Sequence, residues 1–222
     1  MRKFLVPAMA AAAAALFIPL QAAIPATAAP TASHDVLTIK KVGGTNVRVG
    51  AKLRAGLKSG TKATFLTPGD NYVKCSSVTF TATVTKNPKK KGTADEKLTT
   101  QIYKKCTTNI SIATGAPKVV LNDLPYKTTL SDSKGDPVTV SGTTATISVP
   151  ASIGGTLVCH YGADKKKTHG SASNVSQTIS FSSQPFKLTS GPDGCPKTGK
   201  FTATFGPVKD TSVKGDPHVY VN

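Results

Sequence analysis

The chain has 222 residues, of which 38% are hydrophobic, 28 are Lys or Arg, 11 are Asp or Glu, four are Cys and none is Trp. This length suits one domain or two small ones, and the apolar content is sufficient for a buried core. The composition excludes a coiled coil, which needs Ala/Glu/Leu/Lys-rich helical periodicity, and a collagen-like fibre, which needs far more glycine.

The first 28 residues have the pattern of a secretory signal peptide. Residues 1–3 are a basic start, residues 4–20 are mostly apolar, and residues 26–28 (Ala-Thr-Ala) have the small-x-small pattern cleaved by signal peptidase. A membrane-spanning helix needs about 20 apolar residues, whereas this stretch is shorter and is interrupted by Pro7 and Pro19. We therefore predict a signal peptide over residues 1–28, export of the rest, and no transmembrane anchor.

Short runs of β-branched and aromatic residues predict an all-β fold. Such residues favour a pleated, half-buried surface, and their period of two turns one side inward. In chain order the runs are residues 36–39, 78–84, 118–121, 138–140, 145–149, 156–158, 178–181, 201–205 and 219–221. Residues 93–105 are also predicted mainly as strand, because their apolar face is too sparse for an amphipathic helix. Gly- and Pro-containing turn signals at a spacing of about ten residues indicate an antiparallel β-sandwich or barrel-like fold.

All four cysteines (Cys75, Cys106, Cys159 and Cys195) lie after the signal segment. An even number in an oxidising compartment predicts two disulfides. Four cysteines allow three connectivities, and we favour Cys75–Cys106 and Cys159–Cys195, because sequential pairing joins neighbouring strands in a chain of hairpins. Bridges that close loops of roughly 30 to 37 residues stabilise the fold by about 3.5–4 kcal/mol each. A zinc site is disfavoured, since no Cys-x2-Cys occurs.

The distribution of cysteines also suggests a boundary near residue 70. Residues 29–70 contain no Cys, whereas residues 71–222 contain all four. We therefore expect an N-terminal β segment over 29–70, followed by a disulfide-bridged β-sandwich domain over 71–222.

Several of these features together resemble a known group of proteins. They are Cys75 followed by Phe80-Thr-Ala-Thr-Val84, then Asn87-Pro88, Leu98-Thr-Thr-Gln101 leading to Cys106, and the closing Tyr220-Val221-Asn222. Over most of residues 65–222 the chain resembles small secreted, signal-sequence-bearing proteins of actinobacteria such as Streptomyces. The resemblance implies an extracellular or cell-wall location and a disulfide-bridged β fold, and it brings no catalytic or ligand-binding residues. Where those proteins have Ser or Thr, this chain has Lys at 89–91 and 165–167.

Residue types that often carry catalysis stand in unfavourable contexts. The histidines, of which His160 and His169 flank a lysine-rich turn and can approach across a hairpin, are not accompanied by a Gly-x-Ser-x-Gly motif. Two histidines alone are too few for a metal site. Glu96 is the single glutamate, which disfavours a catalytic carboxylate pair, and the aspartates occupy turn sequences, where Asp bonds to its own backbone. We predict no catalytic residue, no metal, no cofactor and no enzymatic activity.

Lysine-rich turns are the strongest functional signal. After the signal segment, 26 basic residues oppose 11 acidic ones, a formal charge of +15. The lysines of two turns are the candidate polyanion-binding residues: Lys86, Lys89, Lys90 and Lys91 around Asn87-Pro88, and Lys165, Lys166 and Lys167 in the second turn. Such clusters attract polyanions, and they also keep a protein soluble without any further role. Few aromatic residues are interleaved, so specific nucleic-acid binding is not predicted.

The sequence therefore predicts a secreted, non-catalytic binding or surface-structural protein that associates with anionic cell-wall polymers through its lysine-rich loops. The alternative is a β-sandwich module that carries a small ligand or docks a secreted protein partner. Four tyrosines either line a cleft in such a module or pair at the edge of the core: Tyr72, Tyr103, Tyr126 and Tyr161.

Overall fold

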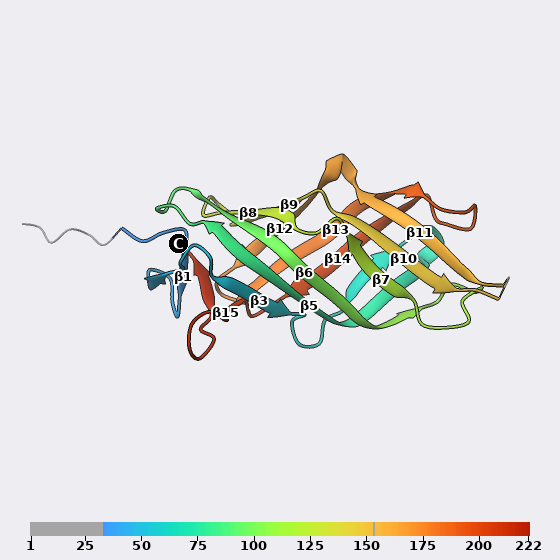
Figure 1. The fold of residues 1–222 in the computed structure, drawn as a ribbon, viewed down its shortest axis with the longest axis horizontal. Helices are drawn as coiled ribbons and strands as arrows, with labels where there is room; N and C mark the ends of the chain where they lie inside the picture. Colours follow the sequence, from blue (N-terminus) through green and yellow to red (C-terminus); the bar gives the residue numbers. More distant parts are fainter. Residues whose placement is uncertain (1–32, 153) are drawn as a thin grey trace, which may run out of the picture. The chain divides into compact units, whose positions relative to one another are not determined.

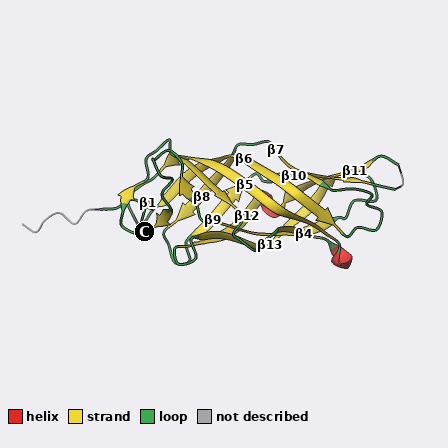
Figure 2. Ribbon diagram, turned by 90° about the horizontal axis from the view of Figure 1, so that it is seen from below, coloured by secondary structure: helices red, strands yellow, loops and turns green. Residues whose placement is uncertain are grey.

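The computed structural model describes residues 33–152 and 154–222, so the predicted signal peptide over 1–28 lies outside the described residues. These residues form antiparallel strands and two short 3-10 turns, η1 (Pro68–Asp70) and η2 (Asp164–Lys166), which confirms the all-β prediction (Figures 1 and 2). The strands in chain order are β1 (Leu37–Ile39), β2 (Thr45–Asn46), β3 (Lys52–Gly56), β4 (Ala63–Leu66), β5 (Tyr72–Lys86), β6 (Thr93–Thr108), β7 (Lys118–Asn122), β8 (Tyr126–Ser131), β9 (Pro137–Ser141), β10 (Thr144–Pro150), β11 (Thr156–Ala163), β12 (Lys167–Ser173), β13 (Thr178–Ser190), β14 (Thr198–Phe205), β15 (Lys209–Asp210) and β16 (Val219–Val221). No helix in these two ranges is long and apolar enough to cross a membrane.

Eight strands close into a barrel. Around it the order is β4, β5, β6, β8, β9, β12, β13 and β14, and β14 pairs with β4 again. Strands β11, β10 and β7 extend this sheet from β13, and β3 pairs with both β5 and β15. A separate three-stranded sheet has the order β16-β1-β2. The fold therefore combines a closed ring with an added layer of strands, in agreement with the predicted sandwich or barrel-like class.

Beyond the closed ring, the sheet stays open on one side, between β6 and β7. Residues 93–98 of β6 pair with β8, but residues 99–108 pair only with β5. Strand β7 ends the extension from β13 and pairs only with β10. The two strands lie side by side without a ladder of hydrogen bonds between them (Figure 1). We call this place, between β6 residues 99–108 and β7, the seam.

A β-bulge in β6 changes which side chains face the interior. Its extra residue is Thr99, because the two residues that flank it oppose consecutive residues of β5. Glu96 and Leu98 face inward before the bulge, and Gln101 and Tyr103 line the interior after it. A bulge re-aims side chains in this way without ending the strand, so both sets belong to one wall.

The two predicted disulfides are present with the favoured connectivity. Cys75 of β5 lies directly opposite Cys106 of β6, and Cys159 of β11 is bonded to Cys195, which precedes β14. All four residues are buried, and no cysteine of the described residues is free.

The expected boundary near residue 70 does not separate two units of the described chain. Strands β3 and β4 both pair with β5, and β4 also pairs with β14. Residues 33–222 accordingly form one compact unit. The lack of cysteine in residues 29–70 does not report on which strands these residues pair with, and the length of β5 gives the earlier strands a partner across residue 70.

Candidate functional site

Three cavities follow one another through the interior of the sheet, and together we call them the lumen. The seam cavity, the middle cavity and the end cavity have volumes of about 70, 50 and 30 Å³. The first two share wall residues, among them Leu98, Gln101 and Phe181, and the last two share Phe80, Glu96 and Ile179. Because each cavity shares wall residues with the next, the three cavities lie in series along the interior.

The seam cavity is lined mainly by apolar side chains from both sides of the seam. Strand β6 contributes Gln101 and Tyr103, and β7 contributes Val119 and Leu121. These four residues are only partly buried, so the cavity meets the solvent along the seam. Its other lining residues come from β4, β5, β9, β10, β12, β13 and β14 and include Ala63, Phe65, Val73, Cys75, Val140, Ala145, Ile147, Thr168, Phe181, Phe186, Phe201 and Phe205.

Aromatic rings form the deeper wall of the lumen. The ring of Phe65 lies 4.8 Å from that of Tyr161 and 5.9 Å from that of Phe186, centroid to centroid. Further along, the ring of Phe205 lies 5.3 Å from Phe80 and 6.4 Å from Phe181. The Phe65–Tyr161 pair is tilted and the other three are edge-to-face; aromatic pairs at these separations are attractive beyond their buried area, so they stabilise the wall.

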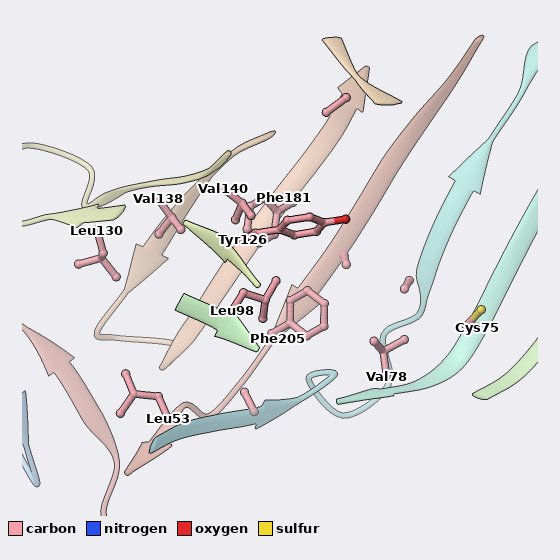
Figure 3. Packing of buried hydrophobic residues seen from close by; sticks show 14 of the residues in the cluster. Leu53, Cys75, Val78, Leu98, Tyr126, Leu130, Val138, Val140, Phe181 and Phe205 are labelled. Carbon is pink, nitrogen blue, oxygen red and sulfur yellow. The ribbon is translucent and has the colours of Figure 1, made fainter. Parts of the chain in front are cut away.

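Figure 3 shows how the centre of the lumen is packed. The side chains of Leu98, Val140, Phe181 and Phe205 gather there from four different strands. Glycine makes room for the rings: a Cβ on Gly199 of β14 would lie 2.2 Å from an atom of the Phe65 ring. Any larger residue at that inward position would displace the ring from the wall.

Among the polar side chains that line the seam cavity, Thr143 and Gln101 differ in whether their hydrogen bonds are satisfied. Thr143, between β9 and β10, lines the seam cavity, and its buried hydroxyl is without a hydrogen-bond partner among the described residues. Gln101 donates from its side-chain amide to the hydroxyl of Tyr103, at 2.5 Å. An unsatisfied buried hydroxyl costs free energy, so Thr143 offers a hydrogen bond to whatever enters the cavity.

Among the described residues that line the lumen, Glu96 is the one with an ionisable carboxyl. It forms part of the walls of the middle and end cavities and is 8% exposed. Burial away from water raises the pKa of its carboxyl to about 7, because the charged form loses its hydration. No sequence signal marked it as functional except its place in an alternating run, where Ala94 and Leu98 are the other buried members.

The four tyrosines singled out from the sequence have different positions. Tyr103 lines the lumen, and burial raises the pKa of its phenol above the usual range. Tyr161 donates a hydrogen bond to the carbonyl of Pro196 at 3.0 Å, and burial raises its pKa to about 12. Tyr126 is buried, and its hydroxyl accepts a hydrogen bond from the Thr144 amide at 3.0 Å. Tyr72 lies outside the lumen walls, under the Lys74 ammonium.

The lysines of the two candidate turns are all exposed but belong to different parts of the molecule. Lys86, Lys89, Lys90 and Lys91 lie at the tip of the β5–β6 hairpin, beside β1 (Figure 1). Lys165 and Lys166 lie in η2, beside β13, and Lys167 begins β12. Lys89 pairs with Asp35 at 3.7 Å. The Asn87 side chain bonds to the backbone of Leu37 and Val47.

The second lysine turn does not join a hairpin, which corrects the expectation for His160 and His169. Strands β11 and β12 do not pair with each other; they pair with successive parts of β13. His160 instead lies 2.9 Å from the Thr146 hydroxyl, and His169 lies 3.3 Å from that of Thr139. Among residues 33–152 and 154–222 no group of three or more His, Cys, Asp or Glu side chains could hold a metal ion.

Comparison with known proteins adds no further assignment. No family model matches the chain, and neither a curated protein nor a solved structure matches it.

Proposed function

We propose that this protein is a secreted, non-catalytic binding protein that carries a small, mainly apolar ligand in its lumen. The observation that carries the proposal is the seam cavity lined by Phe65, Phe181, Phe186, Phe201 and Phe205, which reaches the solvent at the seam. Ligand sites in proteins are typically concave and apolar, with a few polar groups that fix orientation. Small closed barrels have an interior wide enough for one small ligand.

The polar groups of the lumen support binding over mere packing. A core that served stability alone would gain from an apolar residue in place of the unpartnered Thr143, since a buried hydroxyl without a hydrogen bond is destabilising. A ligand that bonds this hydroxyl removes that cost. The exposed Ile102 and Val120 add an apolar rim on the outside of the seam, where a ligand would enter.

A fluorescence experiment tests this function. N-phenyl-1-naphthylamine, an uncharged apolar probe, should bind the oxidised protein in a saturable way with increased emission. Val119→Trp fills the seam cavity from β7, and it should weaken probe binding at least 10-fold. Val49→Trp is the matched control, because Val49 is 64% exposed and lines none of the three cavities; its binding should equal that of the wild type.

The outcomes of this experiment separate a lumen site from a surface site. Equal binding by the wild type and both variants places the probe outside the lumen and contradicts the proposal, as does a lack of saturable binding. Circular dichroism and the unfolding midpoint of both variants establish that the barrel is intact.

Attachment to an anionic cell-wall polymer is a second candidate, supported by the exposure of all seven lysines in the two turns. The separation of the turns and the pairing of Lys89 with Asp35 make it the weaker one. Retention on purified anionic cell wall at low salt, with release at high salt, supports it. Retention that is independent of salt, or its absence, contradicts it.

A further inference from the structure

Glu96 is the single glutamate of the chain, and its side chain faces the interior of the barrel. Its neighbours in β6, Asp95 and Lys97, belong to the outer face, where Asp95 pairs with Lys127 at 3.8 Å. The strand thus directs one acidic side chain inward and one outward.

No cation accompanies Glu96 inside. Across the two ladders of β6 it lies opposite Val84 of β5 and Thr128 of β8. The ion pairs of the described residues involve other acids, namely Asp35, Asp95 and Asp164. Burial is the sole cause of the shift in its pKa, without a contribution from a charged or hydrogen-bonding neighbour.

The walls of all three cavities share this lack of positive charge. Their lining residues include no Lys, Arg or His, although the described residues carry 26 Lys and Arg. The other titratable side chain in the walls is the phenol of Tyr103, whose raised pKa keeps it neutral. An anionic ligand would find no countercharge in the lumen and one carboxyl that repels it.

We propose that the ligand is an apolar amine whose protonated nitrogen pairs with the Glu96 carboxylate, while its hydrocarbon part occupies the aromatic stretch toward the seam. This inference rests on the proposed function, and it names the chemical class that the lumen selects. A buried carboxylate is costly when alone and is stabilised by an opposite charge with good geometry. The ligand supplies the positive charge that the lumen walls lack.

Binding of an amine should be pH-dependent, with a definite direction. The Glu96 carboxyl has a pKa of about 7 without ligand, whereas an alkylammonium keeps its proton to about pH 10, like a lysine side chain. The charged pair therefore forms more readily as the pH rises from 5.5 to 8.5. No other titratable group of the cavity walls ionises in this interval, so the slope reports Glu96.

The test compares three competitors of N-phenyl-1-naphthylamine that differ only in the head group: dodecylamine, dodecanol and dodecanoic acid. At pH 8.5 the wild type should bind dodecylamine at least 10-fold more tightly than dodecanol, and dodecanoic acid should be the weakest. The advantage of the amine should fall to about 2-fold or less at pH 5.5.

Glu96→Gln keeps the shape and the hydrogen-bonding capacity of the side chain and removes its charge. This variant should bind dodecylamine and dodecanol within 2-fold of each other at every pH while still binding the probe. Asp95→Asn changes the net charge by the same amount on the outer face, and it should keep the full preference for the amine.

The results distinguish this inference from the function on which it rests. If the probe and the three competitors bind without preference for the amine, the role of Glu96 is wrong and the carrier function stands. An unchanged preference in Glu96→Gln has the same meaning. If neither the probe nor any competitor binds, both proposals are overturned.

Discussion

The outer surface of the barrel and the lumen inside it differ in charge although they alternate along the same strands. In β6, Asp95 and Lys97 face outward and Glu96 faces inward. The described residues have a net charge of +15, yet the lumen walls contain a single ionisable carboxyl and no basic residue. Long-range attraction of anions by the surface and the proposed selection of a ligand by the lumen therefore depend on different residues, and mutations can address them one at a time.

The largest expected effect comes from removing an aromatic ring of the lumen wall. Phe205 is 2% exposed and packs edge-to-face against Phe80 and Phe181. Phe205→Ala should lower the free energy of unfolding by about 3–5 kcal/mol, through lost burial and the cavity it leaves. Ile102→Ala, on the outer face and 50% exposed, should change it by about 0.5 kcal/mol or less. Urea unfolding of the oxidised proteins measures both, and similar values would mean that the lumen wall is not a packed core.

The next effect is the pH dependence of stability due to Glu96. Its pKa is about 7 in the folded protein and 4.5 in the unfolded chain. Between these values the unfolded chain is ionised while the folded protein holds its proton, so stability falls as the pH rises from 4.5 to 7 and is level above. The full change is about 3 kcal/mol.

The difference between the wild type and Glu96→Gln isolates this effect, because the other acids are common to both. In the variant, the free energy of unfolding should lose this slope between pH 4.5 and 7, as determined by urea unfolding at each pH. A difference that does not vary with pH would place Glu96 in contact with water.

How well the sequence predicts a strand depends on the length of its alternating run of apolar residues. The clear alternation of Val78, Phe80, Ala82 and Val84 predicts β5 correctly, and an even cysteine count together with hairpin order predicts both bridges. The short strands β3, β4, β8 and β12 are not predicted, because none of them contains Val or Ile. Closure of the ring through β9–β12 and β14–β4, like the seam, depends on pairing between segments distant in sequence and has no local signature.

The candidate site was still harder to predict. The sequence disfavours Glu96 as a catalytic acid because it has no partner carboxylate. Inside the lumen, the lack of a partner leaves this carboxyl available to a ligand. Alternation within the runs 78–84, 178–181 and 201–205 places Phe80, Phe181 and Phe201 at inward positions, but inward-facing rings pack a core and line a cavity with the same sequence pattern. Only the distances between strands decide which of the two occurs.

A smaller effect, of opposite sign, is expected for the hydroxyl near the seam. Thr143→Val removes an unpartnered buried hydroxyl without changing the side-chain shape, and it should raise the free energy of unfolding by about 1 kcal/mol. Thr178→Val is the matched control, since Thr178 is also buried but its hydroxyl lies 2.7 Å from that of Ser176; it should be destabilised by about 1 kcal/mol. Equal effects in the two variants would mean that Thr143 is satisfied.

The smallest effect on stability is expected from the lysines of the outer surface. Glutamine in place of Lys86, Lys89, Lys90 and Lys91 together should change the free energy of unfolding by about 1 kcal/mol or less, since exposed ion pairs such as Lys89–Asp35 contribute little. The same variant should elute from immobilised polyglycerol phosphate at lower salt than the wild type. Its binding of the apolar probe should not change, because none of these residues lines the lumen. Loss of probe binding in this variant would show that the surface and the lumen are not independent, because the lysine turn would then control what enters the barrel.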